Sequence, residues 1–301
     1  MSELLDLPTP LLARPLVMSD ATAVYEVMAA QEAHDIGDVS IEEADIVGDW
    51  QRPSYDVSAG TIGVFDGDRL VAYAEHMGGD RGDAAVHPDY RGSGIGTTLA
   101  GWMQERARAS GASVVGMPVP IDSPGDRLLQ SLGYRVRWES WELQLPEGAT
   151  IAARELPAGY TIREATPDDY ESCWTVLEDA FLEWSVRDRE PFEDFVARTI
   201  ERPGFESWNL RVVTDAADEV VGVTFVHPFG TQGYVDRIAT RKDQRGQGIA
   251  QAMLVDAFAV AREHGCETST LNTDSRTGAL GLYEKVGMRV YRTWVNRAKD
   301  L

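Results

Sequence analysis

Two glycine-rich hexapeptides are the segments of this chain best suited to chemistry. Residues 91–96 read Arg-Gly-Ser-Gly-Ile-Gly, and residues 245–250 read Arg-Gly-Gln-Gly-Ile-Ala. Glycine lets the backbone approach a bound group closely, and the free amides and dipole at the start of a helix attract an anion. Each hexapeptide therefore predicts a phosphate-binding loop. Neither has the Lys of a P-loop, and Thr97 and Gln251 stand where a dinucleotide-binding loop has its third glycine.

The two hexapeptides belong to a long internal repeat. Adding 154 to a residue number maps the first hexapeptide onto the second and maps Gly111 onto Gly265, with no insertion over this span. A repeat that keeps its register this far indicates duplicated architecture. We therefore predict two domains, residues 1–148 and 149–301, each about 150 residues long and able to bury its own core.

Hydrophobic spacing predicts the elements that position the second hexapeptide. Strands are expected at 210–214 and 220–227, and a third, at 233–240, runs directly into the loop. Apolar residues then recur at helical spacing on one face: Ala250, Met253, Leu254, Ala257, Phe258 and Ala261. The later elements expected are a strand at 267–271, a helix at 277–286 and a strand at 289–295. The first half repeats this order, with strands at 60–65, 69–76, 84–86 and 114–118, a helix at 124–131 and a strand at 134–145.

Two motifs resemble those of the GNAT superfamily of N-acetyltransferases. The family pattern Arg/Gln-x-x-Gly-x-Gly/Ala is filled in both hexapeptides, and residues 282–288, Leu-Tyr-Glu-Lys-Val-Gly-Met, are similar to the family signature Leu-Tyr-Glu-Lys-x-Gly-Phe. The chain thus resembles a tandem GNAT protein with the two-domain architecture of the mycothiol synthases. The resemblance implies a layered α/β (α+β) fold in which each domain has a mixed, largely antiparallel sheet, flanking helices and a splayed central strand pair.

The resemblance also implies a cofactor, acetyl-CoA, with its pyrophosphate on the loop amides. In the second half, backbone groups of the strand before the loop would bind the pantetheine and the acetyl carbonyl. The cofactor-binding residues expected there are Ile238, Ala239, Thr240, Arg245, Gly246, Gln247, Gly248, Ile249, Ala250 and Ser275. Those expected in the first half are Val86, Arg91, Gly92, Ser93, Gly94, Ile95 and Gly96.

Catalytic residues are expected in the second half. In the family, the Tyr of the Leu-Tyr-Glu-Lys signature commonly protonates the departing thiolate, and Tyr283 occupies that position. The first half has Leu129 at the matched place, and Leu has no proton to donate. We therefore expect residues 149–301 to be catalytic and residues 1–148 to be a degenerate copy.

An amine nucleophile must lose a proton, and three side chains are candidates for the base. Asp236 lies on the strand before the loop, where side chains border the acceptor, and is the preferred candidate. His227, at the end of the preceding strand, and Glu183, near the early helices, are the alternatives. The five His residues show no metal-ligand spacing, so we expect no metal site.

The function expected is transfer of an acetyl group from acetyl-CoA to a primary amine of a small molecule, by direct attack in a ternary complex. A peptide or protein N-acetyltransferase would use the same chemistry on a chain terminus or a lysine. A non-catalytic acyl-CoA-binding sensor is a further alternative, although a pure binding protein needs no acid at Tyr283.

Composition restricts the partners and the compartment. The formal net charge of −21 argues against nucleic acid, whose phosphates need a basic surface. Cys173 and Cys266 form no disulfide framework, and no signal peptide or membrane-spanning stretch is recognisable. We expect a cytoplasmic protein with no membrane partner. A monomer is expected, because two fused copies supply internally the pairing that single-domain relatives obtain by dimerising.

Overall fold

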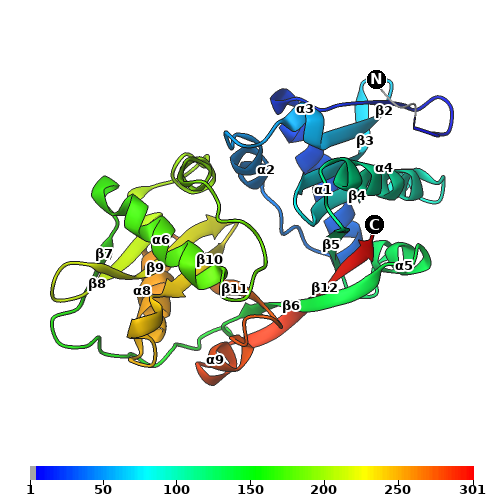
Figure 1. Cartoon of the computed structure of the whole chain (residues 1–301). Coiled ribbons are helices and arrows are strands. Elements are labelled where there is room, and N and C mark those ends of the chain that lie inside the picture. Colours follow the sequence, from blue (N-terminus) through cyan, green and yellow to red (C-terminus); the bar gives the residue numbers. More distant parts are fainter. Residues whose placement is uncertain (1–4) are drawn as a thin grey trace. The chain divides into compact units, whose positions relative to one another are not determined.

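The computed structural model describes residues 5–301, which form two compact units (Figure 1). Unit 1 contains the described chain up to Glu139 together with Trp294–Leu301, and unit 2 contains Ser140–Thr293. Each unit has a mixed, largely antiparallel sheet flanked by helices, as predicted for the fold class. Unit 1 therefore includes the end of the chain, whereas the prediction placed all of residues 149–301 in the second domain.

The sheet of unit 1 has the strand order β1-β2-β3-β4-β5-β12, and only the β4–β5 pair is parallel. Its strands are β1 (Leu12–Arg14), β2 (Thr61–Asp66), β3 (Arg69–Gly78), β4 (Arg81–Val86), β5 (Val114–Pro120) and β12 (Arg289–Asp300). Its helices are α1 (Ala21–Ile36), α2 (Glu43–Trp50), α3 (Val57–Gly60), α4 (Ile95–Ala109) and α5 (Pro124–Ser131).

The sheet of unit 2 has the order β6-β11-β10-β9-β8-β7, and only the β10–β11 pair is parallel. Its strands are β6 (Arg135–Gln144), β7 (Thr161–Glu164), β8 (Leu210–Thr214), β9 (Val220–Phe229), β10 (Gln232–Thr240) and β11 (Thr268–Asp274). Its helices are α6 (Tyr170–Phe181), α7 (Phe192–Phe195) followed by a π-helical turn (Val196–Ile200), α8 (Ile249–Glu263) and α9 (Leu280–Lys285).

The last strand of each half completes the sheet of the other unit. In unit 2, β6 pairs with β11 from Thr270 opposite Gln144 to Asp274 opposite Ser140. In unit 1, β12 pairs with β5 from Trp294 opposite Pro120 through Asp300. The final strand expected at 289–295 therefore continues to Asp300, because its second part has a partner strand in unit 1.

The central parallel pair of each sheet separates, as predicted. In unit 2, β10 and β11 pair only as far as Val235 opposite Leu271, although both strands continue beyond that point. In unit 1, β4 and β5 meet only where Arg81 lies opposite Gly116. The residues of β10 after Val235 therefore have one paired edge, against β9, and one open edge.

A β-bulge distinguishes β10 from β4. The β9–β10 register shifts between Val235 and Arg237, so Asp236 is the extra residue on β10. The matched strand β4 keeps its register with β3 from Gly82 to Val86. The bulge re-aims side chains at the point where β10 leaves β11, and this is the position expected for the reacting groups.

Helices cover both faces of the sheet in unit 2. Val226 and Val235 pack with Leu254 of α8 on one face, and Val223 and Phe225 pack with α6 and α7 on the other. The apolar face predicted for α8 is buried except at Ala250, which is half-buried. Gly265, with φ +91°, follows the end of this helix. The strand-to-helix loop thus joins a central strand of the sheet to a helix packed on that sheet.

The helix predicted at 277–286 is shorter in the structure. It begins only at Leu280, because Gly278 adopts a left-handed φ of +66° and the Thr277 hydroxyl accepts from the amide of Ala279. These local hydrogen bonds compete with the first helical turn. None of the helices in residues 5–301 is both long enough and apolar enough to cross a membrane.

Candidate functional site

Both hexapeptides form a strand-to-helix turn with the same backbone. Gly248 is the residue before α8, with φ +86°, and Gly94 is the residue before α4, with φ +90°. Gly246 and Gly92 also have positive φ angles, +79° and +80°. This left-handed conformation strongly favours glycine, which has no Cβ, so both glycines suit the loop. The amides of each loop lie at a helix start, where an anion is favoured.

The arginine that opens each loop braces the loop against a helix. Arg245 donates to the carboxylate of Glu183 at 3.0 and 2.8 Å, and its Nε donates to the Thr240 carbonyl oxygen at 3.1 Å. In unit 1, Arg91 makes the equivalent bidentate pair with Asp35 at 2.6 and 2.9 Å. These guanidinium groups hold the loops in shape, and each already forms two hydrogen bonds to a carboxylate.

This arrangement disfavours Glu183 as the base. The hydrogen bond from Arg245 lowers the pKa of the Glu183 carboxyl, despite the opposing effect of partial burial. A carboxylate with a lowered pKa is a weaker proton acceptor. Glu183 is better described as the partner that fixes the motif arginine.

The open edge of β10 presents backbone amides in unit 2. Arg241 donates its backbone N–H to the Val221 carbonyl at 2.8 Å, and residues 237–240 pair with β9 in unbroken antiparallel register. Because N–H groups alternate between the two edges of a strand, the amides of Ile238 and Thr240 point away from β9. No side chain in the described part of the chain accepts a hydrogen bond from either amide.

In unit 1, side chains accept hydrogen bonds from the backbone amides at the matched positions. His87 donates to the Val71 carbonyl, so the amides of Val86 and Ala84 face the open edge of β4. The Gln31 side chain of α1 accepts from the Val86 amide at 3.0 Å, and Asp83 accepts from the Ala84 amide at 2.8 Å. The first half therefore satisfies internally the backbone donors that the second half leaves open. Sequence analysis missed this difference, because Gln31 lies far from β4 along the chain.

Tyr283 is a buried phenol with an available hydroxyl. It lies on α9, 8% exposed, within the core that also contains Leu271. Its hydroxyl makes no hydrogen bond to any residue between 5 and 301, although buried tyrosines usually find a partner. Burial raises the pKa of Tyr283 to about 12, so the proton is present at neutral pH. At the matched position in unit 1, Leu129 is buried in the apolar core.

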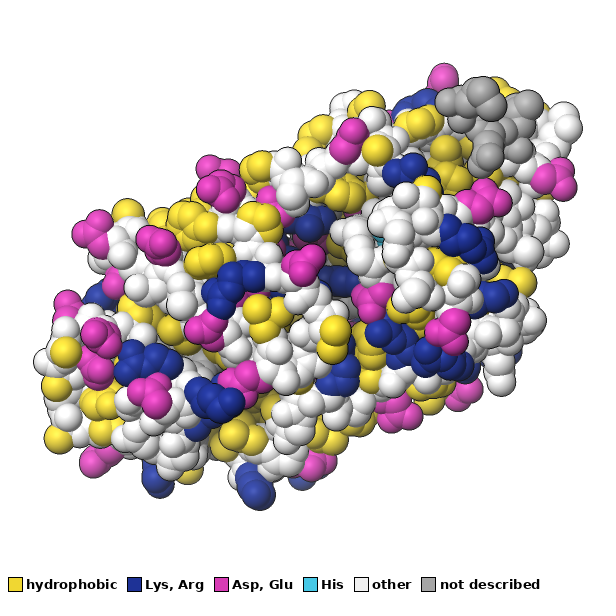
Figure 2. All heavy atoms as spheres, viewed as in Figure 1, with side chains coloured by type: hydrophobic (Ala, Val, Ile, Leu, Met, Phe, Trp, Pro, Cys, Tyr) yellow, Lys and Arg dark blue, Asp and Glu magenta, His cyan; other side chains and the backbone are white. Residues whose placement is uncertain are grey.

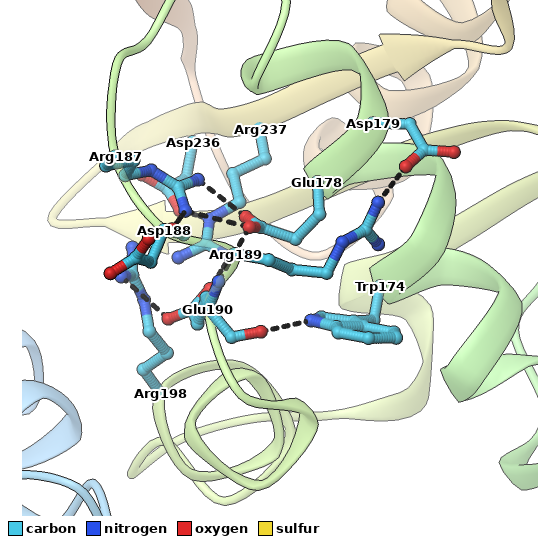
Figure 3. Close-up of polar contacts among 10 residues, drawn as sticks. All are labelled: Trp174, Glu178, Asp179, Arg187, Asp188, Arg189, Glu190, Arg198, Asp236 and Arg237. Atoms are coloured by element: carbon cyan, nitrogen blue, oxygen red, sulfur yellow. Dashed lines mark hydrogen bonds and ion pairs between the residues drawn. The ribbon is translucent and has the colours of Figure 1, made fainter.

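Asp236 projects from the bulge of β10 into a charged cluster (Figure 3). Its carboxylate lies 3.4 Å from Nε of Arg237, and its side chain is 36% exposed. Arg237 also lies 3.8 Å from the carboxylate of Glu190. Asp236 is therefore partly accessible and flanked by a fixed cation, while the carboxylates around it are bound to other arginines.

Glu178 organises the loop that borders this cluster. Its carboxylate accepts from both terminal nitrogens of Arg187, at 2.8 and 2.6 Å, and from the backbone amide of Glu190 at 2.8 Å. Trp174 adds a bond from its indole N–H to the Glu190 carbonyl at 2.9 Å. Both side chains come from α6, and Figure 3 shows them reaching the loop together. Burial by itself would raise the pKa of Glu178, but the hydrogen bonds from Arg187 and from the Glu190 amide, together with the nearby arginine charges, lower it.

His227, near the C-terminal end of β9, is enclosed among aromatic rings. It is 5% exposed, and its ring lies 5.4 Å from Phe225 and 5.5 Å from Tyr234, centroid to centroid. Its Nδ1 lies 3.1 Å from the Pro228 carbonyl oxygen. Asp236, with its exposed carboxylate, is the more accessible of the two candidates.

Ser275 lies in the exposed turn after β11. In the same turn, Arg276 pairs with Asp274 at 2.6 Å and lies over the ring of Trp184, 4.7 Å from its centroid. The turn is thus held by its own ion pair and by an aromatic contact with the segment after α6. The role of Ser275 in cofactor binding remains a prediction.

A pocket of about 560 Å³ lies between α6 and the segment after β10. One wall is a stripe of α6 that includes Thr175 and Asp179, and the other is formed by residues 240–243 and Arg245. The Arg245–Glu183 pair contributes to both walls. The pocket therefore lies beside the glycine loop, on its α6 side.

The corresponding face of unit 1 carries buried carboxyl groups. Glu75 of β3 lies opposite Asp83 of β4, and burial raises the pKa of Glu75 to about 7. Tyr73 donates to Asp83 at 2.8 Å, and Trp50 donates to Glu75 at 3.2 Å. No group of His, Cys, Asp and Glu side chains arranged to hold a metal ion was found within the described residues.

Comparisons with known proteins agree with this geometry. The pattern of the "Acetyltransferase (GNAT) family" matches residues 24–134 and 162–288, one match in each half. The mycothiol acetyltransferase of Salinispora arenicola is 32% identical over 227 residues, which cover 71% of each chain. The two family matches confirm the predicted tandem arrangement.

Solved structures share the fold over nearly the whole chain. A GCN5-related N-acetyltransferase from Sphaerobacter thermophilus is 26% identical, with a TM-score of 0.73 and coverage of 98% of this chain and 96% of its own. Saccharomyces cerevisiae N-myristoyltransferase with bound myristoyl-CoA has a TM-score of 0.70 at 11% identity, covering 99% of this chain and 80% of its own, and shows the fold alone. From the family matches, the paired glycine loops and the separated strands, we conclude that the chain is an acyltransferase that belongs to the acetyltransferase (GNAT) family.

Proposed function

We propose that unit 2 transfers an acetyl group from acetyl-CoA to the primary amine of a small molecule, by direct attack in a ternary complex. The observation that carries this proposal is the pair of unengaged amides on β10, at Ile238 and Thr240. In unit 1, the amides at the same positions donate to the side chains of Gln31 and Asp83. Backbone donors left open beside a phosphate-binding loop suit an extended, amide-containing thioester.

The residues of unit 2 fit acetyl-CoA at three points. The loop amides at Gly246 and Gly248 would hold the pyrophosphate, and the open edge of β10 would hold the pantetheine and the acetyl carbonyl. Acetyl-CoA would supply an activated acetyl group, and the CoA thiolate would be the leaving group. The separation of β10 from β11 after Val235 gives this edge its free backbone groups.

Proton transfers are assigned to two side chains. Tyr283 holds a proton at neutral pH because burial raises its pKa to about 12, and we assign it the protonation of the departing thiolate. A thiolate leaving into the same apolar surroundings is itself made more basic by burial, which favours that transfer. Asp236, at the bulge, is assigned the proton lost by the attacking amine.

The acceptor is proposed to be a small polar molecule. The face that borders Asp236 carries Arg187, Arg198 and Arg237 among carboxylates (Figure 3), and such a surface suits a hydrophilic acceptor. The name of the Salinispora arenicola relative, mycothiol acetyltransferase, supports a small-molecule acceptor. Acetyl-CoA-dependent release of free thiol, measured with a panel of small primary amines, tests this assignment.

Two matched substitutions test which unit holds the cofactor. Gly248→Glu and Gly94→Glu each place a bulky anion at a left-handed residue before a helix. We expect Gly248→Glu to abolish acetyl-CoA binding in a calorimetric titration, because the glutamate repels and blocks the pyrophosphate. Gly94→Glu should bind as the wild type does.

The opposite pattern would assign the cofactor to unit 1 and contradict the proposal. Thermal melting of both variants checks that the substitution has not unfolded its unit. Binding by the wild type without turnover on any amine or peptide would favour the acyl-CoA sensor over an enzyme of this specificity.

A further inference from the structure

A strap formed by residues 151–154 crosses the start of α8. Ile151 is buried in the core that contains Leu254. One residue later, the Ala152 carbonyl accepts from the side chain of Gln251, in the first turn of α8, at 2.8 Å. The backbone of the strap is therefore anchored beside the glycine loop, on both its apolar and its polar side.

The side chain of Arg154 lies against Gly248. A Cβ atom built on Gly248 would be 2.4 Å from Nε of Arg154 and 2.7 Å from its Cγ. A larger residue at this position would therefore displace the Arg154 side chain, in addition to straining the positive φ angle. The guanidinium is placed at the start of α8, next to the amides that form the phosphate-binding loop.

Unit 1 repeats the strap without the arginine. The Asp6 carbonyl accepts from the Thr98 hydroxyl of α4 at 3.0 Å, as the Ala152 carbonyl accepts from α8. Two residues beyond Asp6 the chain has Pro8, where the second strap has Arg154. A Cβ atom on Gly94 would meet nothing within 4 Å. The added cation is therefore specific to unit 2.

Arg154 has no carboxylate partner, although the chain is strongly acidic. The sequence has 49 acidic residues against 28 Lys and Arg, and on the face drawn in Figure 2 basic side chains lie among acidic ones. The neighbouring Arg245 pairs with Glu183, and Arg241 pairs with Asp243. Across residues 5–301, Arg154 makes no hydrogen bond or ion pair. A cation left unpaired at a phosphate-binding loop is available to an anionic ligand.

We propose that Arg154 binds the pyrophosphate of acyl-CoA and is a cofactor-specificity residue contributed by the strap. The inference rests on the proposed function, in which unit 2 holds acetyl-CoA. The motif arginine cannot fill this role while it braces the loop against Glu183. Arginine suits the task because its planar fork donates two hydrogen bonds to phosphate oxygens.

The test is a set of calorimetric titrations with the full-length chain. Acetyl-CoA is titrated into the wild type, Arg154→Gln, Arg154→Lys and the control Arg289→Gln, which removes the same charge from an exposed, unpaired site on β12. Arg154→Gln should weaken binding about tenfold or more, as expected for loss of a charge-assisted hydrogen bond. Arg154→Lys should recover part of the loss, and Arg289→Gln should bind as the wild type does.

A phosphate-free thioester separates this role from a structural one. S-acetylpantetheine should bind the wild type and Arg154→Gln equally, and the salt dependence of acetyl-CoA binding should be shallower in Arg154→Gln. Equal acetyl-CoA affinity in wild type and Arg154→Gln, or an equal loss for the phosphate-free thioester, would overturn the inference alone. A wild type that binds no acetyl-CoA would overturn the proposed function and the inference with it.

Discussion

At the scale of single residues, the two halves differ most in which buried polar groups already have a hydrogen-bond partner. Among residues 5–301 the Tyr283 hydroxyl has no hydrogen-bond partner, whereas the hydroxyl of Tyr134, a buried tyrosine of unit 1, accepts from the side-chain amide of Gln104 at 3.2 Å. A free phenol in an apolar core is costly unless something else uses it. This contrast supports a chemical role for Tyr283 and a structural one for Tyr134.

The acid–base pair is tested by two single substitutions. Tyr283→Phe should lower kcat by about 10² to 10⁴, the usual contribution of a general acid, with little change in acetyl-CoA affinity. Because the pKa of Tyr283 is raised to about 12, the phenol stays protonated below that pH, and its ionisation should cause no loss of activity up to about pH 10. Asp236→Asn should lower kcat/KM for the amine by a similar factor.

Steady-state rates against pH measure both effects. Tyr134→Phe is the control, because it removes a buried hydroxyl from unit 1 and should leave kcat unchanged. Full activity in Tyr283→Phe would eliminate this residue as the acid. An Asp236→Asn variant with wild-type kcat/KM across the pH range would remove Asp236 from the mechanism.

At the scale of elements, the C-terminal end of each early helix is tied to the glycine loop by the same ion pair. Glu183 after α6 holds Arg245, and Asp35 in α1 holds Arg91. The brace fixes the loop relative to that early helix. The loop is thereby shaped before any ligand arrives, which reduces the ordering cost of binding.

Removing the brace should loosen the loop locally. In Glu183→Gln, the backbone amides of residues 245–249 should exchange hydrogen up to about fivefold faster, as expected for a partly exposed ion pair. Hydrogen-exchange mass spectrometry measures this, with Asp35→Asn as the matched variant for residues 91–95. Unchanged exchange at 245–249 would show that the glycine turn keeps its shape without the pair.

At the scale of the whole molecule, the two halves are linked by exchanged strands. Residues 294–300 of β12 pair with β5 along their full length, and Val295 and Ala298 are buried in unit 1. Arg297 adds an ion pair with Asp126 at 2.6 Å. The last residues of the chain are therefore part of the first unit, although they follow unit 2 in sequence.

Deleting residues 294–301 should destabilise unit 1 selectively. Strand β5 would lose its antiparallel partner and become an edge with unpaired backbone groups. We expect hydrogen exchange of residues 114–120 to rise strongly while α8 keeps its protection. Asp300→Asn, which breaks only an exposed pair with Arg135, should leave both regions unchanged. Equal loss of protection in α8 would show that the two units do not unfold separately.

The sequence by itself determined the features that depend on local patterns. Short stretches of sequence contain the loop glycines, the apolar face of α8 and the Leu-Tyr-Glu-Lys segment. The repeat, the strand-to-helix loops and the GNAT family could therefore be predicted from them. The order of elements also followed, because hydrophobic spacing is a local property.

Only the tertiary structure decided which backbone and side-chain groups remain unengaged. Three contacts join residues that are distant in sequence. Gln31 accepts a hydrogen bond from the Val86 amide, Glu183 pairs with Arg245, and Arg154 lies against Gly248. Local sequence patterns also do not predict that β6 pairs with β11 and β12 with β5, because both strands have a similar pattern and could pair with either sheet. The physical reason is that a hydrogen bond or an ion pair depends on which groups meet in space, and spacing along the chain does not specify that.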